Sequence, residues 1–179
     1  MAEGLTESGA PADRVGRVLY RIARFLTICG GILLLMVAGL TTVSITGRAA
    51  SVGPIPGDFE LVAIGTGLCI FAFLPYCQLM GGNVLVDIFT AAASPRFKAF
   101  MEAISGLAYL AIAALLTWRL IYGGLDMYED HESSITIGFP RWTTIPASVL
   151  LMAFLIVVIA YSIWRSLSEM RTPDQSPKN

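Results

Sequence analysis

Residues 142–164, WTTIPASVLLMAFLIVVIAYSIW, form a run of 23 residues without a charge, bounded by Arg141 and Arg165. A helix needs about 20 apolar residues to cross a hydrocarbon core about 30 Å thick. Within a bilayer only a helix satisfies its backbone hydrogen bonds inside one segment, and the alternation typical of barrel strands is absent here. This stretch therefore predicts a transmembrane helix over residues 143–164.

Three further runs of the same kind precede it. They cover residues 25–47, 61–86 and 103–125, the last of them interrupted only by Arg119. These runs predict spans at about 25–46, 60–79 and 101–122, and hence an all-α integral membrane protein with four transmembrane helices. One membrane domain is expected over residues 14–171. The segments 1–13 and 172–179 are rich in Gly, Ser, Pro and charge, and are expected to be disordered tails.

The composition of the whole chain agrees with a membrane protein. Of its 179 residues, 55% are hydrophobic and only 14% are charged, with a mean hydropathy of +0.70. A soluble domain carries roughly a quarter charged residues. The net charge is −1, so the chain offers no basic field for a phosphate backbone, and nucleic-acid binding is not expected.

Basic residues lie mostly on one side of the predicted spans. Nine of them precede the first span, lie between the second and third, or follow the fourth: Arg14, Arg17, Arg21, Arg24, Arg96, Lys98, Arg165, Arg171 and Lys178. The other two loops offer one each, Arg48 and Arg141. The positive-inside rule then places both termini in the cytoplasm and the acidic segment 126–132 outside.

Local signals refine the second span and the segment after it. The residues 54–57 predict a turn, after which Asp58 is expected to cap the second helix, with Glu60 in its first turn. Residues 84–92 predict a short amphipathic segment at the cytoplasmic interface between the second and third spans. This segment contains Asp87, which we expect to contact backbone donors or a cation.

The sequence offers little support for chemistry. The only histidine, His131, lies in a loop, so a haem held by axial histidines within the spans is not expected. The three cysteines fall inside predicted spans, where they resemble small packing residues. No nucleophile elbow, zinc-protease or phosphate-loop motif is present. The residues 129–132, Glu-Asp-His-Glu, favour a solvated loop or a docking surface over a metal site. We expect no enzyme, no cofactor and no metal.

Arg119 is the only charge within the four runs. Two interpretations remain open: its side chain snorkels to the outer headgroups, or it pairs with a partner carboxylate. None of the runs contains an Asp or Glu. A self-sufficient secondary transporter usually places an ionisable coupling residue or an unwound helix near the midplane, and we expect neither in this chain. The chain alone therefore has the character of a scaffold.

Five short motifs carry a resemblance to a known family. They are TGR at 46–48, PIPGDFEL at 54–61, LPYCQ at 74–78, GGNVLVD at 81–87 and WTTIP at 142–146. With its length and four spans, the chain resembles the small membrane subunit of the tripartite ATP-independent periplasmic (TRAP) transporters over about residues 15–168. It departs from the family's usual pattern at Met80 and Asn83, where a basic residue and a histidine are common.

The resemblance implies a function. It implies a subunit of a sodium-coupled transporter of organic acids in the bacterial inner membrane. In that role the chain supports a large permease as its stator and helps to dock a periplasmic substrate-binding protein. Membrane lipids are the remaining partner, and a 1:1 heterodimer with the large permease is expected. Candidate partner-contact or structural polar residues are Arg48, Asp58, Glu60, Gln78, Asn83, Asp87, Arg119, Glu129, Asp130 and Arg141.

Two other classes stay open from the residues alone. One is a small homo-oligomeric channel or exporter, although the polar residues of the spans are too scattered to outline a path. The other is an anchor or assembly subunit of a different membrane complex, such as a respiratory enzyme.

Overall fold

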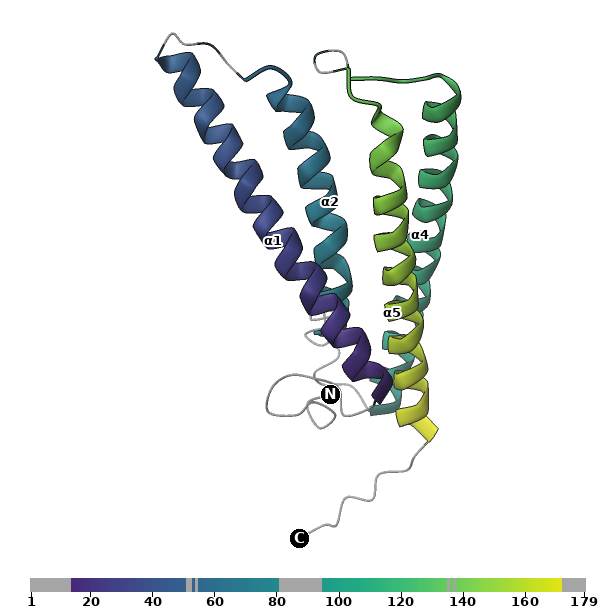
Figure 1. The fold of residues 1–179 in the computed structure, drawn as a ribbon. Helices are drawn as coiled ribbons and strands as arrows, with labels where there is room; N and C mark the ends of the chain where they lie inside the picture. The colour runs from purple at the N-terminus through teal and green to yellow at the C-terminus, as the bar shows by residue number, and fades with distance from the viewer. Residues whose placement is uncertain are drawn as a thin grey trace.

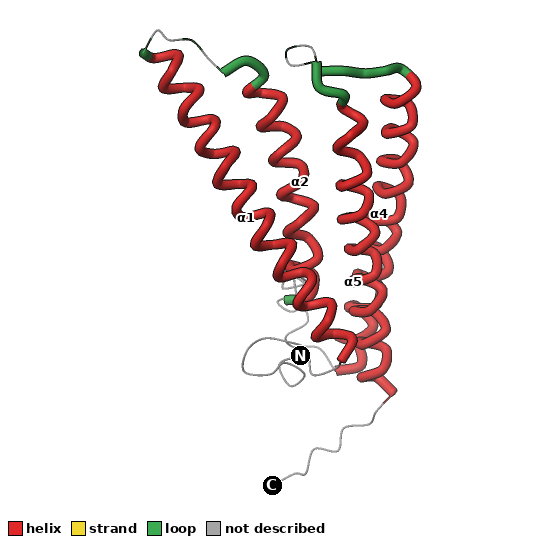
Figure 2. Tube along the Cα trace, viewed as in Figure 1, coloured by secondary structure: helices red, strands yellow, loops and turns green. Residues whose placement is uncertain are grey.

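The computed structural model describes residues 14–50, 53, 55–80, 95–134, 136 and 138–171. Figures 1 and 2 show these residues as a bundle of long helices lying side by side. The predicted tails 1–13 and 172–179 lie outside the described residues. The predicted interfacial segment 84–92, with Asp87, and the candidate Asn83 also lie outside them.

Four helices are long and apolar enough to cross a membrane, which confirms the predicted fold class. They are α1 (Arg14–Ala49), α2 (Asp58–Leu79), α4 (Pro95–Glu129) and α5 (Ile145–Arg171), with a 3-10 turn, η1 (Arg141–Thr144), leading into α5. Both α1 and α4 extend beyond the predicted spans at each end, because polar flanking residues continue the helices past the apolar runs.

The four helices form two pairs, which contact each other mainly through α2 and α5. α1 packs on α2, α4 packs on α5, and α2 contacts α5. The bundle has two ends, the loop end and the terminal end (Figure 1). The loop end is where α1 and α4 stop, and the terminal end is where α1 begins and α5 stops. α1 starts beside α5 at the terminal end and leans away from it toward the loop end (Figure 1).

The buried core is small and lies mainly against α5. One cluster joins Ala113 of α4 to Met152, Leu155 and Ile159 of α5. A second cluster joins Leu19 of α1 to Val158 and Tyr161 of α5, and so holds the start of α1 in place. Most other large apolar side chains are exposed, as is expected of a surface that faces lipid.

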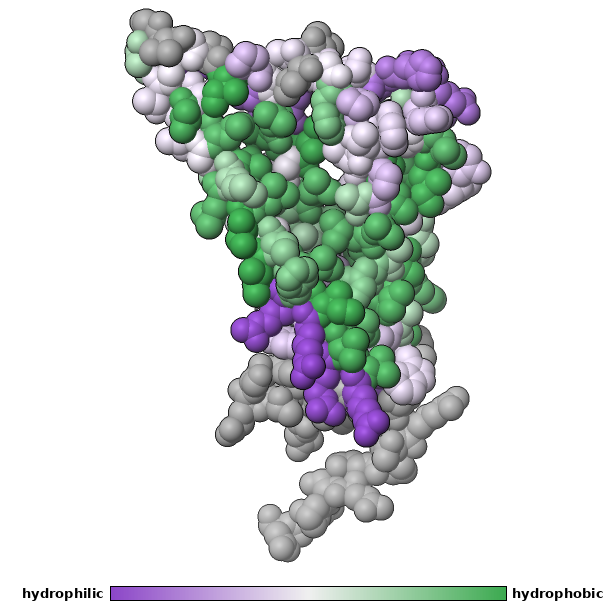
Figure 3. All heavy atoms as spheres, in the orientation of Figure 1, coloured by the Kyte–Doolittle hydropathy of each residue, from purple (hydrophilic) through white to green (hydrophobic). Residues whose placement is uncertain are grey.

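The surface divides into an apolar belt and two polar ends. Figure 3 shows hydrophobic residues around the middle of the bundle, with strongly hydrophilic residues at the terminal end. In α1, four arginines of that end follow the spacing i, i+3, i+7 and i+10, and all are exposed: Arg14, Arg17, Arg21 and Arg24. This helical spacing keeps the four charges on one face, opposite the buried Leu19 and Ala23.

Glycines permit close approach within each helix pair. Between α1 and α2, a Cβ on Gly30 would lie 3.0 Å from Ala72 Cβ, and one on Gly65 would lie 2.5 Å from Val37 Cγ2. Between α4 and α5, a Cβ on Gly106 would lie 2.8 Å from Ile163. Small residues at such contacts are typical of membrane helices, because they let backbones approach closely.

The start of α2 differs from the prediction for Asp58. Gly57, with a φ of 75°, occupies the N-cap position, and no side chain caps the helix there. Asp58 is instead the first helical residue, and its Oδ1 accepts the N–H of Phe59 at 2.9 Å. The capping prediction is therefore wrong. The left-handed φ suits a glycine at the N-cap. The carboxylate of Asp58 instead binds side chains of α1.

The segment 126–132 is not all loop. α4 continues through Glu129, so Asp126 and Glu129 stand on its last turns and only residues 130–132 leave the helix. The extension is held by packing: Gly124 lies directly against Ile145, and the ring of Tyr128 meets that of Trp142 edge-on, with centroids 5.3 Å apart.

We predict that Gly65→Ala will lower the free energy of unfolding by about 1–3 kcal/mol, because the new methyl group overlaps a stiff β-branched side chain. Gly67→Ala is the matched control, since a Cβ there meets nothing within 4 Å. Unfolding of both variants in detergent, followed by circular dichroism, makes the comparison. Equal stability of the two would contradict the close α1–α2 contact.

Candidate functional site at the loop end

A partly buried cluster around the Asp58 carboxylate joins α1 to α2 at the loop end. The Ser44 hydroxyl, whose residue is 1% exposed, donates to Asp58 Oδ2. The Arg48 guanidinium binds the same oxygen, with Nη2 2.5 Å from it. Ser44 and Arg48 are four residues apart and so share one face of α1. Two side chains of α1 thus hold one acid of α2.

The same cluster orders the turn between these helices. The Ile55 N–H donates to Ser44 Oγ at 3.4 Å, and the Arg48 guanidinium carbon lies 5.1 Å from the centre of the Phe59 ring. A guanidinium over an aromatic face is attracted by the ring quadrupole. Arg48 therefore combines one charged hydrogen bond with an aromatic contact, while part of its side chain stays exposed.

Glu60 connects the two helix pairs. Its carboxylate accepts a hydrogen bond from the hydroxyl of Ser134, in the loop between α4 and η1. Ser134 is buried, although the loop around it is largely exposed. Because Glu60 stands in the first turn of α2, this contact ties the α4–α5 pair to the α1–α2 pair at the loop end.

The loop after α4 is itself ordered by backbone hydrogen bonds. The Ser134 N–H donates to the Phe139 carbonyl at 2.8 Å, and the Arg141 N–H donates to the Glu132 carbonyl at 3.1 Å. Ser133 and Pro140 form an isolated antiparallel bridge. The loop therefore doubles back on itself and presents a defined surface.

Acidic side chains cover the exposed rim of this loop. Glu129, Asp130 and Glu132 are all exposed, and His131 between them has a φ of 49°. The His131 ring nitrogen Nδ1 lies 3.1 Å from the Tyr128 carbonyl, which turns the ring back toward α4. No group of three potential metal ligands occurs within the described ranges. Within the described ranges, the arrangement therefore presents exposed negative charge without a cluster of metal ligands.

The remaining predicted residues are dispersed. Gln78 lies in a pocket between α2 and α4 near the terminal end. Arg119 is exposed on α4, and no ion pair of it occurs in the part of the chain that the structure describes. Arg141 is exposed in η1. Of the predicted set, the structure therefore brings Arg48 and Asp58 into contact and places Glu60 nearby in the same helix turn.

Sequence reasoning missed three residues of this site. Ser44 had a usable signal, because it lies one helical turn before Arg48 on the same face of α1. Phe59 is an exposed aromatic residue beside a charged one, which is a weak signal. Ser134 had none, since its partner Glu60 is 74 positions away and nothing local marks the pairing.

Small residues that could form helix contacts face outward. Ala38, Thr42 and Ala63 are exposed, and a Cβ on Gly67 would meet nothing within 4 Å. The closest approaches between α1 and α2 use Gly30 and Gly65 instead. Positions suited to close contact therefore remain open on the surface.

Four apolar helices, a cluster of polar contacts at the loop end and an exposed charged rim are the features of a multi-pass membrane subunit. The family model described as "Tripartite ATP-independent periplasmic transporters, DctQ component" matches residues 37–169. The chain belongs to this family, and is accordingly a small permease component of a TRAP transporter, not an enzyme. The resemblance found in the sequence is thus confirmed. No curated protein and no solved structure matches the chain significantly.

We predict that Arg48→Gln will lower the free energy of unfolding by about 1–2 kcal/mol, because it removes a charged hydrogen bond from a partly exposed pair. Arg119→Gln is the control and should change it by less, since its guanidinium has no ion pair within the described chain. Chemical unfolding in detergent measures both. If the two losses were equal, the Asp58 cluster would not be a structural tie.

Proposed function

We propose that this chain is the stationary small subunit of a sodium-coupled TRAP transporter for organic acids in the bacterial inner membrane. It binds a large permease subunit as a 1:1 heterodimer, and its loop end helps to dock the periplasmic substrate-binding protein. The family assignment supports the class of complex. The lack of any acid in the four apolar runs supports the stator role, because coupling to an ion normally needs such a group.

The topology in this proposal has both termini in the cytoplasm and the loop end in the periplasm. The nine basic residues of the terminal side support it. The four exposed arginines of α1 would then lie at the cytoplasmic surface. The Arg48–Asp58 pair, Glu60, Arg141 and the acidic rim at Glu129 and Asp130 would face the periplasm, where a soluble partner can reach them.

The helices offer the large permease a surface rather than a path for solute. The hydroxyls of Thr27, Thr41 and Thr42 each donate to a carbonyl of their own helix four residues back, at 2.8–2.9 Å. The donors of these hydroxyls are used within their own helix, which favours a packing surface over a polar channel. Exposed small residues such as Ala38, Gly39 and Thr42 on α1 instead permit close contact with another helix.

The decisive experiment compares three preparations in proteoliposomes. We expect the chain alone to move no organic acid, and the chain with its large permease, sodium and binding protein to accumulate it. The permease without the small chain should lose most of its activity or its stability. Uptake by the small chain alone would overturn the stator role and favour a homo-oligomeric channel.

We predict that Glu129→Lys will raise the concentration of binding protein needed for half-maximal uptake, and will leave the maximal rate nearly unchanged. Rim charges mainly affect encounter, and each exposed pair contributes at most about 1 kcal/mol. The increase should be larger at low salt, because ions screen exposed charges. The measurement is initial uptake against binding-protein concentration at two ionic strengths.

Thr46→Val is a neutral control, since this exposed hydroxyl near the same end bonds only its own helix within the described chain. A set of charge reversals at Glu129, Asp130 and Glu132 without any salt-dependent effect would confine docking to the large subunit. Labelling of Asp130→Cys only from the cytoplasmic side would overturn the proposed topology.

A further inference from the structure

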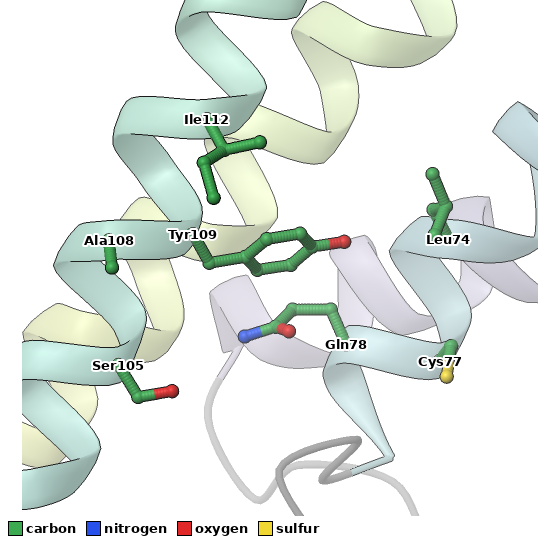
Figure 4. A pocket seen from close by; sticks show the side chains of 7 residues that line it. All are labelled: Leu74, Cys77, Gln78, Ser105, Ala108, Tyr109 and Ile112. Atoms are coloured by element: carbon green, nitrogen blue, oxygen red, sulfur yellow. The ribbon is translucent and has the colours of Figure 1, made fainter.

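A pocket of about 400 Å³ lies between α2 and α4 near the terminal end. Gln78 extends from α2 toward α4 beneath the ring of Tyr109, with Ser105 on the α4 side (Figure 4). Leu74 and Ile112 form the wall on the side of the bundle centre (Figure 4). This volume falls within the range of small-molecule sites in proteins.

Gln78 is the feature that needs an explanation. It is only 8% exposed, and its side-chain amide makes no hydrogen bond with any residue that the structure describes. A buried amide without a partner costs free energy, and such groups are nearly always satisfied. The amide points into the pocket, so a ligand there can supply a hydrogen bond that none of the described residues supplies.

The depth of the pocket follows from the length of α2. Gln78 follows Asp58, at the loop end of α2, by 20 positions, and it stands at the terminal-end limit of the predicted span 60–79. At 1.5 Å per residue this interval is about 30 Å, which is the thickness of the hydrocarbon core. The pocket therefore lies at the edge of that core, where the ester groups of a leaflet are found.

The chemistry of the lining follows a polar-to-apolar order. Gln78, Ser105 and Tyr109 each carry a hydrogen-bond donor, whereas Leu74 and Ile112 are apolar and lie about one turn closer to the bilayer centre. None of the described residues that line the pocket is charged. Donors beside an apolar wall match ester carbonyls followed by an acyl chain.

We propose that this pocket binds the glycerol-ester region and the first part of one acyl chain of a membrane phospholipid, with the Gln78 amide donating to an ester carbonyl. A helix of the permease needs only a complementary contact surface. It does not require hydrogen-bond donors to be followed by apolar side chains toward the bilayer centre, as a lipid does. The proposal goes beyond the proposed function, since it does not depend on the substrate or on the docking surface.

The test uses the full chain in complex with its large permease, in vesicles of phosphatidylethanolamine and phosphatidylglycerol. The probe is a phosphatidylethanolamine that carries a diazirine next to the ester of one acyl chain. After illumination, mass spectrometry maps the labelled peptides. We expect labelling of α2 around residues 74–78 and of α4 around residues 105–112.

Three variants make the test specific. Gln78→Leu keeps the volume and removes the amide, and should lower labelling at this site about fivefold, the change expected for one lost hydrogen bond. Tyr109→Phe should lower it in the same direction. Tyr122→Phe is the matched control, since Tyr122 is exposed on α4 outside the pocket, and should leave labelling unchanged.

Two results would overturn the proposal. One is unchanged labelling in both Gln78→Leu and Tyr109→Phe; if Gln78→Leu failed to assemble, Tyr109→Phe alone would decide, because it removes a single oxygen. The other is a crosslink from a photoreactive residue at 105 to the large permease, or to residues 81–94 of the same chain. Either crosslink would show that protein fills the pocket.

Discussion

Apolar side chains are as well solvated by lipid tails as by one another, so burial of apolar area contributes little to holding these four helices together. Close packing and polar contacts must supply the cohesion. The chain uses both: glycines at 30, 65 and 106 bring helix backbones within each pair close to their neighbours, and the Sγ of Cys69 lies 3.2 Å from the Gly30 carbonyl across α1 and α2. The small core and the many exposed large side chains follow from the same constraint.

Polar contacts between helices are concentrated at the loop end. Asp58 accepts hydrogen bonds from two side chains of α1, and Glu60 accepts one from the loop before η1. Two acids within one turn of α2 therefore connect α2 to α1 and to that loop. This arrangement leaves the acidic rim at Glu129–Glu132 outside the network, exposed and available. The loop end thus combines a base tied by polar contacts with exposed charges, and this combination supports the proposed docking role.

The sequence predicts the four helices well because their signal is local and strong: a run of about 20 mostly apolar residues crosses a bilayer as a helix. It predicts the site poorly, since the partners are set by tertiary contact. The carboxylate of Asp58 has the right type and place for a cap, yet Ser44 and Arg48 of α1 bind it, and Gly57 takes the cap position. The pairing of Glu60 with Ser134 spans two helices and leaves no trace in either local pattern.

A scaffold that holds its own helices with few contacts leaves much of its surface for others. α1 touches α5 only near its start, and between residues 31 and 46 most of its side chains are exposed. Such a helix gains little from its own chain along that length, so a partner or a defined lipid that packs there stabilises both the helix and the complex. For the proposed stationary role this weak internal packing is favourable, because a helix that gains little free energy from its own chain can gain it from a partner, and the stability of the subunit then depends on assembly.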